Sequence, residues 1–109
     1  MIWITGNSGA GKTSIAHELQ NEITDAIVLD GDELRKIWPG LGFSKMDRIE
    51  QNCRAVRLAE SLELQGFTVI LSVICPYKDL RNEFDKEYDI TWIKLRGGKE
   101  PSKEYPYEY

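Results

Sequence analysis

A stretch near the start of the chain has the residue types and spacing of a phosphate-binding loop. Residues 6–13 read Gly-Asn-Ser-Gly-Ala-Gly-Lys-Thr and fit the pattern G-x-x-x-x-G-K-[ST]. Glycines let such a loop curl until successive backbone N–H groups point at phosphate oxygens, and the following helix adds the positive end of its dipole. The pattern predicts a site for the phosphates of a nucleotide; the alternative is a plain glycine turn before a helix.

Lys12 and Thr13 have separate tasks in a loop of this kind, the Walker A loop. The lysine reaches the β and γ phosphates, and the threonine hydroxyl ligates Mg²⁺. We therefore expect ATP and Mg²⁺ as cofactors, Lys12 as a catalytic residue and Thr13 as the metal ligand. The expected nucleotide-binding residues are Gly6, Asn7, Ser8, Gly9, Ala10, Gly11, Lys12, Thr13 and Ser14.

Two carboxylates follow the next apolar run. Asp30 and Asp32 flank Gly31 at the end of that run, which is where α/β proteins bind ligands. The alternative for these acids is a turn and an N-cap for the next helix. Arg35, one helical turn after Asp32, is placed either to pair with Asp32 or to bind an anionic substrate.

The third apolar run lacks a following acid. Residues 72–76 read Ser-Val-Ile-Cys-Pro, so the Walker B aspartate of motor ATPases is absent from this position. This absence favours a kinase of small molecules over a motor or a switch protein.

Four apolar runs alternate with amphipathic stretches along the chain. We expect strands at residues 1–5, 26–30, 67–74 and 90–95, and helices at 12–22, 32–38, 44–66 and around 80–88. The run at 67–74 is almost continuously apolar, which is typical of a strand buried on both faces of a parallel sheet. The order predicts an α/β fold with three layers: a short parallel sheet of about four strands with helices on both faces.

Length and composition are those of one globular domain. The chain has 109 residues, of which 41% are hydrophobic and 29% charged. Residues 1–96 form the expected domain, and residues 97–109, rich in glycine, proline and charge, are expected to be a loop or a frayed tail. Cys53 and Cys75 are expected to be free thiols, because no secretory signal accompanies them.

Charge and hydropathy exclude several partners. A net charge of −4 argues against broad binding of nucleic acid or of an acidic membrane surface. The longest apolar run, residues 69–74, is far shorter than the ~18 residues of a membrane span, and no signal-peptide core is present. We therefore expect a cytoplasmic protein with a small-molecule substrate, no nucleic-acid partner and no membrane partner.

Five motifs follow one another in the order and spacing of one kinase family. They are residues 6–13, 30–35, 41–44, 47–48 and 73–77. In these motifs the chain resembles the adenosine 5′-phosphosulfate kinases (adenylylsulfate kinases) over residues 1–95. The resemblance implies a P-loop kinase fold and transfer of the ATP γ-phosphate to the ribose 3′-hydroxyl of adenylylsulfate, with Mg²⁺. The product is 3′-phosphoadenylylsulfate, the activated form of sulfate.

The resemblance also implies roles for acids and arginines of this chain. Asp30 is the candidate base or orienter for the 3′-hydroxyl, and Asp32 assists it through the water shell of the metal while contacting the substrate. Arg35 and Arg48 would hold the phosphosulfate. For Arg48 the alternative is a solvated charge beside Asp47.

Further residues are implied to line the pocket for the substrate. Phe43 would stack on the adenine, and Ile74 with its neighbour Cys75 would line that pocket; for Phe43 the alternative is a core position. Where the family has an asparagine three residues after the arginine, this chain has Gln51 followed by Asn52, and either amide can bind substrate. Cys75 replaces a serine of the family, which exchanges a good hydroxyl donor for a weak thiol donor.

The family continues after the fourth strand with a basic lid, a helix and a final strand. Here residues 96–99 stand where the lid begins, and Tyr105-Pro-Tyr-Glu108 faintly resembles the stretch before the final strand. Lys99 and Lys103 either substitute for the lid in part or are solubilising charges.

Two functions follow from this departure. One is a compact adenylylsulfate kinase, and the alternative is a truncated, non-catalytic nucleotide-binding module or subunit derived from such a kinase, because a missing lid costs rate. A homodimer fits the family and an exposed sheet edge, but the sequence leaves the oligomeric state open.

Overall fold

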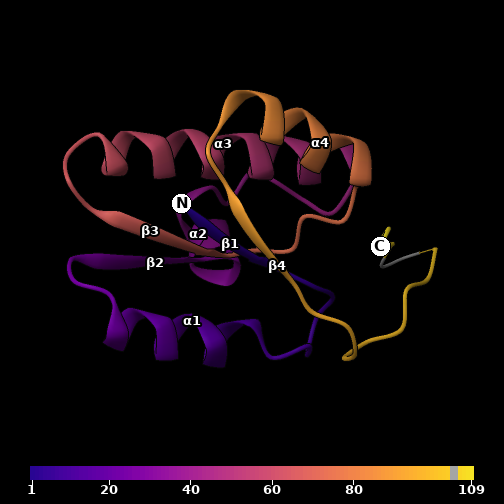
Figure 1. Ribbon diagram of the computed structural model, residues 1–109. Coiled ribbons are helices and arrows are strands. Elements are labelled where there is room, and N and C mark those ends of the chain that lie inside the picture. Colours follow the sequence, from indigo (N-terminus) through magenta and orange to yellow (C-terminus); the bar gives the residue numbers. More distant parts are fainter. Residues whose placement is uncertain (104–105) are drawn as a thin grey trace.

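A parallel sheet of four strands forms the centre of the part of the chain that the structure, a computed structural model, describes: residues 1–103 and 106–109. The strands are β1 (Ile2–Thr5), β2 (Ala26–Asp30), β3 (Thr68–Ser72) and β4 (Thr91–Lys94), in the order β2-β3-β1-β4. Each neighbouring pair is parallel. The carboxyl ends of the strands therefore meet at one edge of the sheet (Figure 1).

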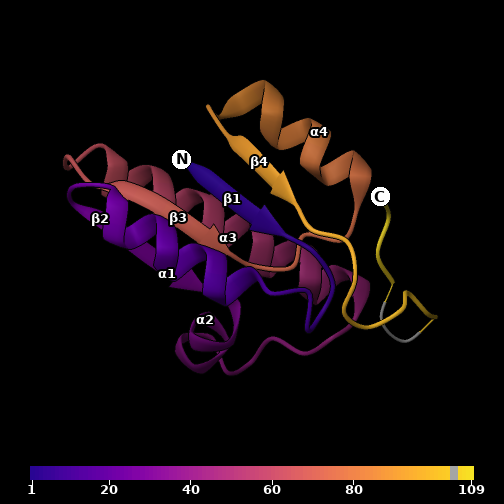
Figure 2. The same ribbon diagram turned by 60° about the horizontal axis from the view of Figure 1, so that its bottom comes forward.

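Helices cover both faces of this sheet. They are α1 (Lys12–Glu22), α2 (Gly31–Ile37), α3 (Lys45–Glu63) and α4 (Lys78–Glu87). Helix α1 lies on one face, α3 and α4 lie on the other, and α2 stands at the carboxyl end of β2 (Figures 1 and 2). The layered α/β fold predicted from the sequence is confirmed. No helix of the described residues is long and apolar enough to cross a membrane.

The central strands β1 and β3 are buried on both faces, which explains their continuous apolar sequences. Trp3 packs towards α3 and α4, with its ring stacked on Phe84 at 5.6 Å and on Trp92 at 5.0 Å. Its neighbour Ile4 packs on the opposite face, with Ala16 of α1. Alternation along a strand thus supplies one side chain to each hydrophobic core.

Strand β3 ends earlier than the sequence predicts, at Ser72 instead of residue 74. Ser72 pairs with Asp30, the last residue of β2, so the ladder on that side has no further partner. Beyond it, the Cys75 amide donates to the Thr5 hydroxyl at 2.9 Å. At Cys75 a side chain therefore replaces the sheet as hydrogen-bond partner, and the chain continues along the edge of the sheet.

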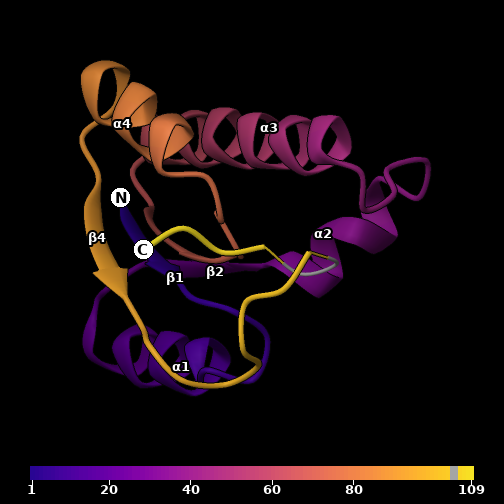
Figure 3. The same ribbon diagram turned by 90° about the vertical axis from the view of Figure 1, so that its right-hand side faces the viewer.

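In its described residues, the segment after β4 contacts the domain. Its described residues, 97–103 and 106–109, contain no helix or strand, but Tyr107 is buried and its hydroxyl lies 3.0 Å from the Thr5 hydroxyl. The Glu108 amide donates to the Pro76 carbonyl at 2.8 Å. These hydrogen bonds hold the end of the chain at the carboxyl edge of the sheet (Figure 3). Tyr105, part of the faint family similarity, lies outside the described residues.

Candidate functional site

A cavity of about 450 Å³ lies at the carboxyl edge of the sheet. One end is formed by the loop between β1 and α1 and by the start of α1, through Asn7, Ser8, Gly9, Gly11, Lys12, Thr13 and Ser14. The other end is formed by α2, α3 and the chain that follows β3, through Asp30, Gly31, Asp32, Arg35, Phe43, Arg48, Gln51, Ser72, Val73, Ile74 and Pro76. We call these the phosphate end and the acceptor end.

The phosphate end has the backbone shape that its glycines allow. Gly9 and Gly11 have φ angles of 81° and 95°, a region that residues with a Cβ rarely occupy. Gly11 is also the residue before α1, and it has no side chain to cap the first amides of that helix. These amides and the helix dipole therefore remain available to an anion.

Lys12 lies folded against its own loop. Its Nζ donates to the carbonyls of Gly6 at 3.0 Å and Asn7 at 3.1 Å. Burial lowers the pKa of this ammonium group, and the nearby carboxylates of Asp30 and Asp32 oppose the shift. Both acceptors are neutral carbonyls. A bound phosphate in their place would give this half-buried ammonium group a negatively charged hydrogen-bond acceptor.

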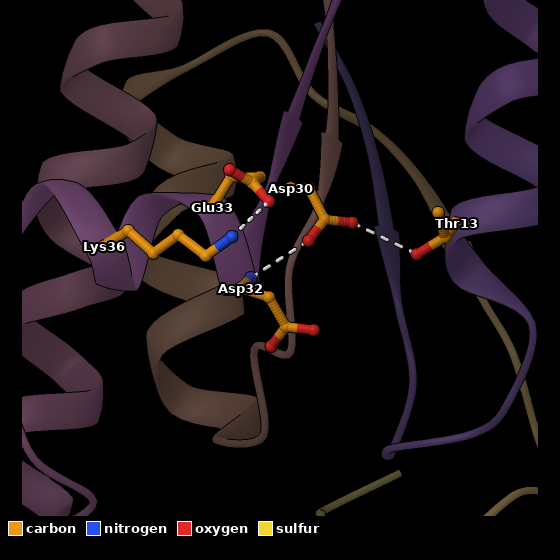
Figure 4. Close-up of polar contacts among 5 residues, drawn as sticks. All are labelled: Thr13, Asp30, Asp32, Glu33 and Lys36. Carbon is orange, nitrogen blue, oxygen red and sulfur yellow. Dashed lines mark hydrogen bonds and ion pairs between the residues drawn. The ribbon is translucent and has the colours of Figure 1, made fainter.

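Asp30 connects the two ends of the cavity (Figure 4). Its Oδ2 accepts a hydrogen bond from the Thr13 hydroxyl at 3.1 Å, and its Oδ1 accepts one from the Asp32 amide at 3.0 Å. The second bond makes Asp30 the N-cap of α2. The capping role considered as an alternative is thus real, and it orients a carboxylate that lines the cavity. Glu33, on the same helix, pairs instead with the exposed Lys36 at 3.0 Å.

Thr13 and Asp30 bring a hydroxyl and a carboxylate oxygen together in the cavity. Such hard oxygen donors suit Mg²⁺, which is commonly held by one or two protein groups together with waters and substrate phosphates. Within the described residues, no group of three or more His, Cys, Asp and Glu side chains is placed to hold a metal ion. The donor set fits a metal that arrives with a nucleotide better than a metal enclosed by protein alone.

The acceptor end is organised around an exposed aromatic ring. Phe43 is 65% exposed, so the core position considered for it from the sequence is wrong. The Arg35 guanidinium lies 4.1 Å from the centre of this ring, and that of Arg48 lies 5.9 Å from it. Burial, and then the proximity of Arg48, lowers the pKa of Arg35. Two guanidinium groups beside an open ring can bind an anion that carries an aromatic base.

Backbone carbonyls and a capped helix hold these groups in place. Arg35 donates to the Gly42 carbonyl at 2.9 Å, and Arg48 donates to the Phe43 carbonyl at 2.8 Å. The Ser44 hydroxyl caps α3 by accepting from the Asp47 amide at 3.1 Å, as its sequence position predicts. The Asp47 carboxylate accepts from the Gly42 amide at 2.9 Å. The loop that carries Phe43 is thus tied to both α2 and α3.

Of the two neighbouring amides, the structure places only Gln51 at the cavity. Its Nε2 donates to the Gly31 carbonyl at 3.2 Å, between the two acids. Asn52 is fully buried and donates to the Ile74 carbonyl at 3.0 Å, so it supports the wall of the cavity instead of lining it.

Three other predicted site residues are absent from the lining of the cavity. Gly6 and Ala10 belong to the phosphate loop but do not line the cavity, whereas Ile74 does. Cys75 is fully buried, and burial raises the pKa of its thiol to about 12. Both cysteines are free thiols, as expected. The structure thus separates Ile74, at the surface of the cavity, from its neighbour Cys75 in the core.

Several residues that line the acceptor end were not predicted from the sequence. Gly31, Ser72, Val73 and Pro76 line it with their neighbours. Their signal is positional, because Ser72 is the last residue of β3 and residues 73–76 continue along the carboxyl edge.

One family of known proteins matches most of the chain. The family model described as adenylylsulphate kinase matches residues 1–95. An adenylyl-sulfate kinase of Rippkaea orientalis is 46% identical over 87 residues, which cover 75% of this chain and 48% of the relative. A probable adenylyl-sulfate kinase of Archaeoglobus fulgidus is 40% identical over 94 residues, covering 82% and 61%. The chain thus spans about half the length of the curated relatives it matches.

Solved structures show the same fold. An APS kinase of Mycobacterium tuberculosis, solved in complex with AMPPNP and APS, has a TM-score of 0.72 at 34% identity, covering 85% of this chain and 60% of that one. A hexameric APS kinase from Thiobacillus denitrificans has a TM-score of 0.76 at 27% identity, covering 99% and 22%.

Proposed function

The chain belongs to the adenylylsulphate kinase family, and from this premise we propose that its cavity binds ATP with Mg²⁺ at the phosphate end and adenylylsulfate at the acceptor end. The reaction is transfer of the ATP γ-phosphoryl group to the ribose 3′-hydroxyl of adenylylsulfate. The products are ADP and 3′-phosphoadenylylsulfate.

One observation carries the proposal: a single cavity joins the phosphate loop to the exposed ring with its two arginines. Phosphoryl transfer requires the attacking oxygen and the leaving oxygen to lie roughly in line on either side of the phosphorus atom. Catalysis of this kind is mostly positioning and electrostatic stabilisation, so both substrates must share one water-poor space.

At the phosphate end, backbone amides of residues 7–13 would bind the phosphates. Lys12 would exchange its bonds to the Gly6 and Asn7 carbonyls for bonds to the β and γ phosphates. Thr13 and Asp30 are the residues that would hold Mg²⁺, directly or through water. When bound, Mg²⁺ neutralises charge that develops on the phosphate oxygens.

At the acceptor end, the Phe43 ring would stack on the adenine of adenylylsulfate, and the guanidinium groups of Arg35 and Arg48 would bind its phosphosulfate. Gln51 would add an amide hydrogen bond beside Gly31. In support, a relative of known structure was solved with both AMPPNP and APS.

Between the two ends, Asp30 would receive the 3′-hydroxyl of the acceptor. Its carboxylate orients that hydroxyl and accepts the proton as the oxygen bonds to the γ phosphorus, while the bond from phosphorus to the bridging oxygen of ADP breaks. Asp32, the second residue of α2, would assist Asp30 through the water molecules bound to the metal.

The test is a coupled assay of ADP release with ATP and Mg²⁺, with and without adenylylsulfate, beside calorimetric titration of each ligand. ADP release that depends on adenylylsulfate is the expected result. Binding of both ligands without turnover would overturn the kinase proposal and leave a nucleotide-binding module. Absence of nucleotide binding would overturn the assignment of the phosphate end as well.

Self-association belongs to the same proposal. Among the described residues, β4 is an edge strand of the sheet with β1 on one side, and such an edge is able to pair with a second chain. We propose a homodimer, and light scattering with size exclusion decides between a dimer and a monomer.

A further inference from the structure

After β4 the chain contacts the phosphate loop again. The sequence motif of the loop does not predict this contact. The Lys99 amide donates to the Ser8 carbonyl at 2.8 Å. In the opposite direction, the Asn7 side-chain amide donates to the Lys99 carbonyl at 2.9 Å, across 92 positions of sequence. Figures 2 and 3 show this segment running beside the turn between β1 and α1.

Gly98 makes the close approach between the two segments possible. A Cβ atom on Gly98 would lie 2.5 Å from the Ser8 carbonyl oxygen and 2.6 Å from the Ala10 nitrogen. Both neighbours are backbone atoms of the phosphate loop, which cannot move aside as the end of a flexible side chain does. Any side chain at position 98 must therefore push the two segments apart.

The loop has a physical need for such a contact. Gly9 and Gly11 give it the positive φ angles that a phosphate cradle requires, but glycine also has the largest conformational freedom to lose on ordering. Within the loop, the Asn7 side chain accepts from the Ser8 amide at 3.0 Å. The same side chain binds Lys99, so one asparagine links the local shape of the loop to the distant segment.

We propose that Gly98 and Lys99 form a clasp that holds the phosphate loop in its nucleotide-binding shape before the nucleotide arrives. Gly98 is a positioning residue in this proposal, because it acts through the backbone of residues 8–10. Because the clasp orders the loop in advance, it lowers the conformational-entropy cost of binding the nucleotide. The inference rests on the proposed binding of a nucleotide at this loop.

The test compares Gly98→Ala with Gly97→Ala. Both glycines have positive φ angles, 68° and 96°, so both substitutions strain the backbone. An added Cβ at Gly97 meets nothing within 4 Å, whereas the one at Gly98 meets the phosphate loop. Gly97→Ala is therefore the matched control for strain without the clash.

We expect Gly98→Ala to raise the Kd for MgADP, measured by calorimetry, about tenfold or more, and Gly97→Ala to leave it within about twofold. Hydrogen exchange of residues 6–11 in the ligand-free protein should become faster in Gly98→Ala only. Equal Kd values and equal exchange in both variants would overturn the clasp. If the unchanged protein binds no MgADP, the proposed function is wrong. The hydrogen-exchange rates of the ligand-free variants still test whether the clasp orders the loop.

A second variant covers the case in which Gly98→Ala does not fold. Asn7→Asp keeps the oxygen that accepts from Ser8 and removes the donor that binds the Lys99 carbonyl. Faster exchange of residues 6–11 in ligand-free Asn7→Asp supports the clasp. Exchange at the unchanged rate overturns it.

Discussion

The two ends of the cavity are built in different ways. The phosphate end comes from one continuous segment, residues 7–14, which runs from the loop after β1 into the start of α1. The acceptor end combines side chains of α2 and α3 with the loop before α3 and the chain after β3. Backbone amides can bind any phosphate chain, whereas a ring with two guanidinium groups near it can select an anion that carries an aromatic base. In the proposed function, the phosphate end would therefore accept phosphates in general, and the acceptor end would select the second substrate.

Asp30 belongs to both ends, and its loss should have the largest effect. Asparagine keeps the N-cap of α2 but cannot accept a proton, so Asp30→Asn should lower kcat about a thousandfold, as expected for loss of general acid–base catalysis. The Kd for ATP measured without Mg²⁺ should change little, because the amides of the phosphate loop and Lys12 are intact. Steady-state kinetics and calorimetry measure the two quantities.

Glu33→Gln is the matched control for Asp30→Asn. This carboxylate lies on the same helix, but it pairs with the exposed Lys36. An equal fall of kcat in both variants would contradict the assignment of Asp30. It would mean that a carboxylate in the cavity matters no more to catalysis than one on the surface of α2.

Lys12→Met tests the phosphate end by itself. Loss of the ammonium group should raise the Kd for ATP between about tenfold and a hundredfold, because a charge-assisted bond to phosphate is worth about 1.5–3 kcal/mol. Lys36→Met, which removes an exposed lysine of α2, should leave this Kd unchanged. Tight ATP binding by Lys12→Met would count against the assignment of the loop.

Phe43→Ala tests the acceptor end by itself. Removal of the ring should raise the KM for adenylylsulfate about tenfold, the usual cost of losing one stacked base, and should leave the KM for ATP unchanged. Ile37→Ala is the control, because Ile37 is exposed to nearly the same extent, 63% against 65%. If both variants behave alike, the ring has no special role in binding.

Cys75→Ala should have the smallest effect on binding. Its thiol lies in the core beneath the acceptor end, so the KM for adenylylsulfate should stay within about twofold of its original value. A rise in this KM as large as that expected for Phe43→Ala would indicate that Cys75 contacts the substrate after all.

The same burial should make the Cys75 thiol unreactive. Only the thiolate is nucleophilic, and a pKa of about 12 keeps Cys75 protonated at about pH 8. Mass spectrometry after native alkylation should find Cys75 unmodified, with the half-buried Cys53 as internal comparison. Rapid modification of Cys75 would show that the wall of the acceptor end opens.

Sequence patterns with short range predicted much of this molecule. The alternation of apolar runs gave the order of strands and helices, and the cap at Ser44 and the acids at the end of β2 lie where their spacing places them. The end of β3 could not be predicted in this way, because it depends on where β2 stops. The choice of Gln51 over Asn52 depends on how α3 is rotated against the sheet.

The sequence by itself determined the phosphate end, because a loop of consecutive residues carries its own geometry in its glycines. Only the tertiary structure decided that Phe43 is open to the cavity, that Cys75 is closed off from it, and that Gly98 touches the phosphate loop. Each of these outcomes depends on contacts between residues far apart in the chain, and local residue types do not specify which distant segments will meet.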